Sequence, residues 1–209
     1  MTPPATHISP LANDEIHIWR SSWAGGAGER AFAGILRSYA GDETVPIERG
    51  EHGKPHFGPP HDGLGFNWSH SGDVALLAVG RGAAGFEVGV DVETVRPRAR
   101  AIELSQRFFA PAETAYLRSL PTAMQLQGFL TLWTAKEAVL KAHGGGLSYG
   151  LHRVSFSLNE EGAKPEAFEG DVGDAAEWQV RPLSLADDLV AAVAWRGAQR
   201  ALRVFTFPL

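Results

Sequence analysis

The sequence contains no cysteine among its 209 residues. The chain can therefore form neither a disulfide nor a thiolate metal site, and any metal must be held by oxygen or by histidine. The absence of cysteine is compatible with a reducing compartment.

Long apolar runs are also absent. Nothing approaches the roughly 20 consecutive apolar residues of a membrane span. The first residues, MTPPATHISPLAND, show no basic segment followed by an apolar core. We expect a cytoplasmic protein that does not span a membrane.

Positive charge is in the minority, with 19 Lys and Arg against 24 Asp and Glu, so the formal net charge is −5. This balance argues against bulk attraction to nucleic acid, and any recognition of phosphate must be local. With 44% hydrophobic residues, the chain can bury the core of one large domain or of two small lobes. We expect it to be a monomer.

A helix is predicted in the segment FLTLWTAKEAVLKAHGGG at 129–146. Its apolar residues follow helical spacing, and Glu137 and Lys141 stand four apart, so acid and base share one face. Three glycines then end the helix. Alone, such a pair is an ordinary helix ion pair that contributes only a few tenths of a kcal/mol.

A strand is predicted upstream, where the valines of Val88 to Glu93 alternate with Gly89, Asp91 and Glu93. Such a strand buries its valines on one face and presents two carboxylates on the other. Alone, this pattern is typical of a solvated strand face. Together with the Glu/Lys pair, the two acids could surround a hard cation and a phosphate.

These stretches, GVDVE at 89–93 and WTAKEAVLK at 133–141, match the two signatures of a known family without a mismatch. A third element of that family appears as GKP at 53–55 followed by NWSHS at 67–71. In order and spacing, the chain from Gly53 to Gly146 resembles the Sfp-type 4'-phosphopantetheinyl transferase family.

The resemblance implies a role for each matched residue. Asp91, Glu93 and Glu137 would hold Mg²⁺. Glu137 would also act as base toward an incoming serine, directly or through water, and Lys141 would stabilise phosphate charge, so these two are the implied catalytic residues. The residues implied to contact coenzyme A are Lys54, Ser69, His70, Asp91 and Lys141.

Other positions carry weaker expectations. Lys136 has at best a secondary phosphate-binding role. Glu113 matches a glutamate that some members use near the metal, but capping of a helix that begins at Pro111 explains it sufficiently. Trp133 is expected in the core.

One segment departs from the family pattern. Many members have a longer basic segment between the first strand and the first helix, which contacts the 3'-phosphate of the coenzyme. Here only SSWAGGAG separates Arg20 from Glu29. Arg30 and Arg37 are the nearest remaining candidates, and we expect Arg30 to make this contact, although an unmatched residue is an alternative.

The expected fold class is α+β. Strands are expected at 15–19, at 74–79 and in four short segments after the signature helix. These last segments are expected to end the second lobe in antiparallel sheet. A helix at 29–41 should bury Phe32, Ile35, Leu36 and Tyr39. Residues 73–82 and 188–197 match in length and pattern, which suggests duplication.

The resemblance implies two similar α/β lobes with antiparallel sheets, related by a pseudo-twofold axis with the active site between them. We place the N-terminal lobe at 1–85 and the C-terminal lobe at 86–209. The coenzyme A phosphates are assigned to the first lobe, and the metal and the signature helix to the second.

The implied activity is Mg²⁺-dependent transfer of 4'-phosphopantetheine from coenzyme A to a serine of an acyl or peptidyl carrier protein. Two alternatives are a metal-dependent phosphohydrolase, in which water replaces serine, and a catalytically inactive carrier-binding module. The basic segment 96–109 follows the acidic strand. We expect it to receive the acidic carrier through Arg98, Arg100, Ile102 and Leu104.

Overall fold

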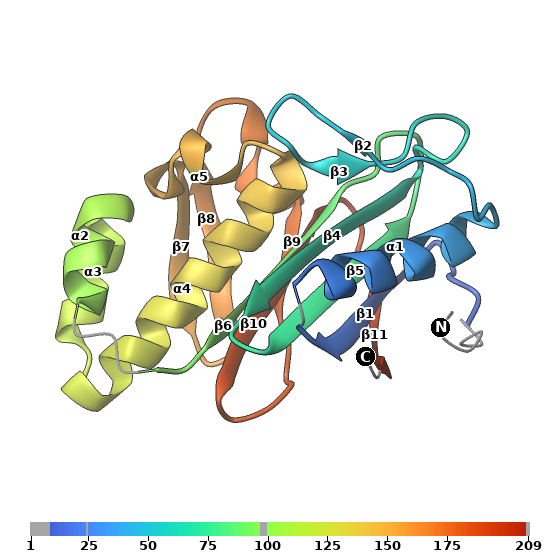
Figure 1. Ribbon diagram of the computed structural model, residues 1–209. Coiled ribbons are helices and arrows are strands. Elements are labelled where there is room, and N and C mark those ends of the chain that lie inside the picture. The colour runs from blue at the N-terminus through green and yellow to red at the C-terminus, as the bar shows by residue number, and fades with distance from the viewer. Residues whose placement is uncertain (1–8, 24, 97–99, 208–209) are drawn as a thin grey trace.

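The structure is a computed structural model that describes residues 9–23, 25–96 and 100–207. Its strands form two main sheets, each accompanied by one long helix (Figure 1). The α+β composition expected from the sequence is confirmed in this coarse form.

The first sheet has four strands in the order β11-β1-β5-β4. They are β1 (Glu15–Ser22), β4 (Leu64–Ser71), β5 (Val74–Arg81) and β11 (Ala201–Phe207). Helix α1 (Gly26–Ala40) packs on one face of this sheet and ends at Gly41, whose φ of 70° is the left-handed conformation that glycine adopts without strain. The four residues predicted to point inward, Phe32, Ile35, Leu36 and Tyr39, are all buried.

The second sheet has three antiparallel strands in the order β6-β10-β9. They are β6 (Val88–Thr94), β10 (Leu189–Arg196) and β9 (Trp178–Pro182). Helix α4 (Thr122–His143) lies across this sheet and ends at Gly144, with a φ of 95°, which confirms the predicted stop.

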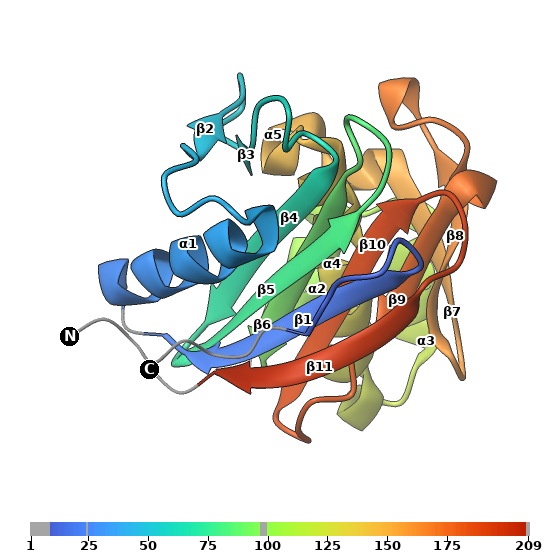
Figure 2. The same cartoon turned by 90° about the vertical axis from the view of Figure 1, so that its right-hand side faces the viewer.

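The two sheets pack against each other through the faces that their helices leave free. Ile16, Ile18 and Leu76 from the first sheet meet Val90 and Val193 from the second in one buried cluster. At one side β4 runs next to β6, where the side-chain oxygen of Asn67 accepts a hydrogen bond from the Val90 amide at 3.0 Å. Figure 2 shows the resulting arrangement, with α1 and α4 on separate sheets. The contact between the edge strands β4 and β6 therefore joins the first sheet to the second.

The smaller elements surround α4. Helices α2 (Ala101–Phe108), α3 (Pro111–Ser119) and α5 (Gly146–Tyr149) accompany a hairpin of β7 (Val154–Asn159) and β8 (Gly162–Phe168). Three 3₁₀ turns connect the strands near them: η1 (Leu151–Arg153), η2 (Gly170–Val172) and η3 (Ala175–Glu177). A two-stranded ribbon, β2 (Glu48–Arg49) with β3 (Pro55–His56), interrupts the loop-rich passage before β4.

The last strand corrects one expectation. Residues 201–207 were expected in an antiparallel sheet of the second lobe, but β11 joins the first sheet and runs parallel to β1. Its aromatic side chains explain the placement, because Phe205 stacks on Trp19 at 4.8 Å and Phe207 is buried in the core beneath α1. The boundary at residue 85 stays a prediction. No helix in the described part of the chain combines the length and apolar character that a membrane span needs.

Candidate active site

The predicted alternation of β6 is present. Val88, Val90 and Val92 are buried between the two sheets, whereas Gly89 and Asp91 face α4 and β4. A Cβ atom at Gly89 would clash with the backbone of Ala138 and Ala142. Helix α4 therefore lies directly on the backbone of β6, which places its acid and base beside the strand carboxylates.

Asp91, Lys141 and Ser69 form a compact polar cluster contributed by three elements. The Asp91 Oδ1 atom accepts hydrogen bonds from Lys141 Nζ at 2.7 Å and from Ser69 Oγ at 2.7 Å. Lys141 Nζ lies 3.0 Å from Ser69 Oγ as well. Asp91 and Ser69 are buried, and the other Asp91 oxygen, Oδ2, is buried without a hydrogen-bond partner in the described structure.

Glu137 is buried on the same face of α4 as Lys141. Burial, reinforced by the negative charges of Asp91 and Glu93, raises the pKa of the Glu137 carboxyl to about 7, although Lys141 opposes the rise. Glu93 is half-buried, and its Oε2 atom accepts a hydrogen bond from Ser71 Oγ at 3.3 Å. The arrangement gathers negative charge that a cation or a proton would relieve.

The donor set fits a divalent cation of the Mg²⁺ type. That ion prefers carboxylate oxygen, and it usually keeps several waters and substrate phosphates in its shell. Within the described residues, no group of three or more His, Cys, Asp or Glu side chains could hold a metal by itself. In the described part of the chain, the Asp91 oxygen without a hydrogen-bond partner and the buried Glu137 carboxyl, whose pKa is raised, are the groups that such an ion would complete.

The side chains of Ser69 and His70 point in opposite directions, because adjacent residues of β4 face opposite sides of the sheet. Ser69 points toward Asp91 and Lys141. The exposed His70 ring instead stacks on Trp23, with centroids 4.4 Å apart. Arg30 is exposed on α1.

Lys54 lies at the C-terminal end of α4. Its Nζ donates a hydrogen bond to the Ala142 carbonyl at 2.6 Å and pairs with Glu87. Burial lowers the pKa of Lys54, and Glu87 partly offsets this effect. The lysine is one of the residues that line a cavity of about 430 Å³ next to Gly144 and Gly145.

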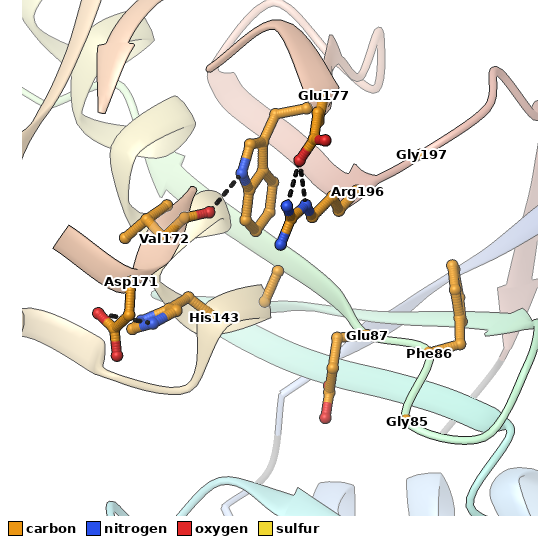
Figure 3. A pocket seen from close by; sticks show the side chains of 11 residues that line it. Gly85, Phe86, Glu87, His143, Asp171, Val172, Glu177, Arg196 and Gly197 are labelled. Atoms are coloured by element: carbon orange, nitrogen blue, oxygen red, sulfur yellow. Dashed lines mark hydrogen bonds and ion pairs between the residues drawn. The ribbon is translucent and has the colours of Figure 1, made fainter. Parts of the chain in front are cut away.

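A second cavity, of about 560 Å³, adjoins the first (Figure 3). The two share Glu87, His143 and Asp171. His143 faces Asp171 with Nε2 and Oδ1 3.4 Å apart, and the Glu177–Arg196 ion pair forms another part of the wall. The two cavities together form a hollow that begins at Ala142, directly after Lys141, and extends past Gly145.

Lys136 has a different place from the one expected. Its side chain is completely buried, and its Nζ lies 2.7 Å from Glu113 Oε1 and 3.0 Å from the Leu151 carbonyl. The expected secondary phosphate contact is therefore wrong. The adjacent residues Lys136 and Glu137 point to different sides of α4. The side that Lys136 faces is filled by other parts of the protein.

Glu113 caps α3, as expected, by accepting a hydrogen bond from the Ala110 amide at 2.8 Å. It also accepts one from the Phe156 amide at 2.8 Å. The alternative role near the metal does not fit these contacts, because both carboxylate oxygens are engaged. Trp133 was expected in the core; it is half-buried and packs against the core among Phe108, Phe109 and Phe129, which confirms the expectation in part.

Of the residues expected to dock a carrier, Arg98 lies outside the described residues. Arg100 is exposed just before α2. Ile102 and Leu104 are half-buried and pack against the core around α4.

Sequence reasoning missed Asn67, Glu87 and Trp23. Of these, only Asn67 carried a signal in the sequence, because it is the first residue of the NWSHS element.

Comparison with known proteins decides the family. A model of the 4'-phosphopantetheinyl transferase superfamily matches residues 87–194, which contain β6 and α4. The chain belongs to this superfamily.

Three relatives of known name extend the match. The 4'-phosphopantetheinyl transferase HetI of Nostoc sp. is 37% identical over 176 residues, which cover 82% of this chain and 70% of HetI. The 4'-phosphopantetheinyl transferase AcpT of Escherichia coli K12 is 42% identical over 119 residues, 56% of this chain and 58% of AcpT. The 4'-phosphopantetheinyl transferase psf-1 of Bacillus pumilus is 41% identical over 97 residues, 46% of this chain and 39% of psf-1. The matches to AcpT and psf-1 cover less than two thirds of each relative, whereas HetI is matched over 70% of its length.

Proposed function

We propose that this member of the 4'-phosphopantetheinyl transferase superfamily transfers 4'-phosphopantetheine from coenzyme A to a serine of an apo acyl or peptidyl carrier protein. The other product is 3',5'-adenosine bisphosphate. The observation that carries the proposal is the cluster of Asp91, Lys141 and Ser69 beside Glu137. In this cluster one buried Asp91 oxygen has no hydrogen-bond partner among the described residues.

Asp91 and Glu137 would hold Mg²⁺, with Glu93 completing or supporting the site. The bound ion would neutralise charge on the pyrophosphate of coenzyme A. Lys141 lies 2.7 Å from Asp91 Oδ1 and is one-quarter exposed along its side chain. It can therefore reach an incoming phosphate without leaving the cluster, and it stabilises the charge of the phosphate undergoing displacement.

Glu137 takes the proton of the attacking serine, directly or through a water. A base works best when its pKa lies near the pH of the reaction. In the metal-free protein the Glu137 pKa is about 7, and a bound Mg²⁺ would lower it and so keep the carboxylate ready to accept a proton. The serine oxygen forms its bond to the phosphorus of the phosphopantetheine group as the bond to 3',5'-adenosine bisphosphate breaks. The attacking serine and the leaving group both belong to the substrates, so the chain needs no nucleophile of its own.

Coenzyme A would extend from the cluster toward the α4 terminus. Ser69 lies at the cluster, and Lys54 lines the cavity one helical turn away. His70 and Arg30 lie on the α1 side and would contact a more distant phosphate. We further propose that the halves 1–85 and 86–209 are pseudo-twofold related lobes, that the protein is a cytoplasmic monomer, and that the carrier docks along 96–109.

The decisive experiment incubates the protein with coenzyme A, Mg²⁺ and an apo carrier protein, and measures the carrier mass. A gain of one phosphopantetheine group supports the proposal. Release of phosphopantetheine without carrier modification would point to the phosphohydrolase alternative. Carrier binding without either reaction would point to an inactive binding module.

A further inference from the structure

We infer that Trp23 is a positioning residue for His70, which it holds ready for a phosphate of coenzyme A. The inference rests on the proposed function for the ligand. Its structural basis is a stack in which the Trp23 and His70 rings lie 4.4 Å apart and only 11° from parallel. Among the described residues, the indole is the one aromatic side chain that stacks on His70.

The indole is fixed from several sides. The Trp23 amide donates a hydrogen bond at 2.7 Å to the Asp73 carbonyl, in the turn between β4 and β5. The ring lies against Gly28 in the first turns of α1, where a Cβ atom would stand 2.6 Å from Trp23 Cε3. The buried Phe32 ring is 6.4 Å away. The indole is therefore a rigid surface between α1 and β4.

His70, by contrast, is exposed near the end of β4. An exposed imidazole that is free to rotate must be ordered when a ligand binds, and ordering one side chain costs affinity. Trp23 orders the ring before binding.

The first test is a double-mutant cycle with coenzyme A as the probe. We expect Trp23→Leu to raise the Kd and KM for coenzyme A about three- to tenfold, as expected for one aromatic stack, with kcat nearly unchanged. In the His70→Ala background, the same substitution should have almost no effect, because its target is gone. An equal loss in both backgrounds would overturn the inference.

The second test reads the His70 ring directly by NMR, without coenzyme A. The indole face should shift the ring protons of His70 upfield in the wild-type protein. We expect this shift to disappear in Trp23→Leu and to persist in part in Trp23→Phe. Identical His70 resonances in the wild-type and Trp23→Leu proteins would show that the stack does not exist in solution and would overturn the inference.

Gly28→Ala provides an independent variant. Alanine favours helix more than glycine does, so the variant keeps α1 while its methyl group displaces the indole. It should weaken coenzyme A binding as Trp23→Leu does, and again only when His70 is present. Phe205→Leu is the matched control, because it removes an aromatic ring that contacts a different histidine. The Phe205 ring on β11 lies 4.9 Å, between centroids, from the His17 ring on β1. It should leave coenzyme A affinity unchanged.

These outcomes are separable from failure of the proposed function. Calorimetric binding and NMR need no turnover, so a coupled Trp23–His70 pair in a protein that modifies no carrier would refute the function and keep the inference. Normal carrier modification with an additive cycle would refute the inference alone. If coenzyme A does not bind the wild-type protein, the function fails, and the NMR test still decides whether Trp23 orders His70.

Discussion

Glu137 is buried next to a second carboxylate, and this fact governs its chemistry. The pKa of about 7 means that the residue gains and loses a proton near neutral pH. The folded-state pKa is raised above the ordinary value of 4.5, so protonation of Glu137 stabilises the folded, metal-free protein relative to the unfolded chain. That contribution is lost as the pH rises from about 4.5 to about 7.

We therefore expect Glu137→Gln to reduce carrier modification by about 100-fold or more, the usual range for loss of a general base. The activity of the wild-type protein should fall toward acid pH as Glu137 becomes protonated, with a midpoint below the metal-free pKa because bound Mg²⁺ favours the carboxylate. The residual activity of the variant should lack this acid limb. Initial rates across a pH series test both points. At pH 8, the metal-free variant should melt no lower than the wild-type protein, and a lower melting temperature would indicate a structural role instead.

Lys136 and Glu113 form a buried ion pair that lies away from the reacting groups. Burial lowers the pKa of Lys136 to about 8, against the opposing effect of Glu113. The ammonium group also lies 4.9 Å from the Phe109 ring centroid and 5.6 Å from that of Phe156. This pair ties α4 to α3 and β7.

Breaking this pair should destabilise the protein strongly. We expect Lys136→Met to lower the free energy of unfolding by about 3–5 kcal/mol, because it leaves a buried carboxylate unpaired. Adding Glu113→Gln should recover part of the loss, because it removes the unpaired buried charge. The recovery should be incomplete, since the single amide oxygen can replace only one of the two carboxylate oxygens that accept the Ala110 and Phe156 amides. Denaturant unfolding measures both. The exposed pair Lys164–Glu166, at 4.0 Å, is the control, and Lys164→Met should change stability by less than about 1 kcal/mol. Equal losses for the two lysines would contradict the argument.

At the scale of elements, the contact between β6 and α4 sets the geometry of the cluster. Gly89 is the position where the helix backbone touches the strand backbone. The spacing of Asp91 from Lys141 depends on that contact, because the two residues lie on different elements.

Gly89→Ala should therefore separate α4 from β6. We expect a loss of about 1–3 kcal/mol in stability from overpacking. We also expect a fall of about 100-fold in transfer, because small displacements of reacting groups are that costly. Kinetics at a temperature where the variant is fully folded separates the two effects. Gly34→Ala is the matched control: an added Cβ there meets nothing within 4 Å, and the helical site favours alanine. Normal activity in Gly89→Ala would contradict the assigned geometry.

At the scale of the whole molecule, the negative net charge is unevenly distributed. Arg96, Arg100 and Arg107 are exposed around the start and end of α2. An acidic carrier would be attracted there despite a net charge of −5.

We expect Arg100→Glu combined with Arg107→Glu to raise the KM for an acidic carrier about tenfold, and more at low salt, because screening weakens such attraction. The affinity for coenzyme A should stay the same. Lys164→Glu with Arg181→Glu makes the same charge change at exposed positions of β8 and β9 and serves as the control. Carrier titrations at two salt concentrations make the measurement, and equal effects of the two pairs would place docking elsewhere.

The sequence by itself determined the local geometry of the site. Alternation along β6 separated the valines from Gly89 and Asp91, and the four-residue spacing of Glu137 and Lys141 put them on one face of α4. Such periodicities follow from backbone geometry alone. The glycine stop of α4 and the cap at Glu113 were predictable for the same reason, since each depends on a few neighbouring residues.

Only the tertiary structure decided which side of each element meets protein and which meets the hollow. It turned Ser69 toward Asp91 and His70 toward Trp23, enclosed Lys136 instead of exposing it, and paired β11 with β1 in a parallel register. It also raised the Glu137 pKa, because burial and the proximity of Asp91 arise from residues far apart in the chain. Desolvation and strand pairing depend on such distant contacts, and a local pattern carries no information about them.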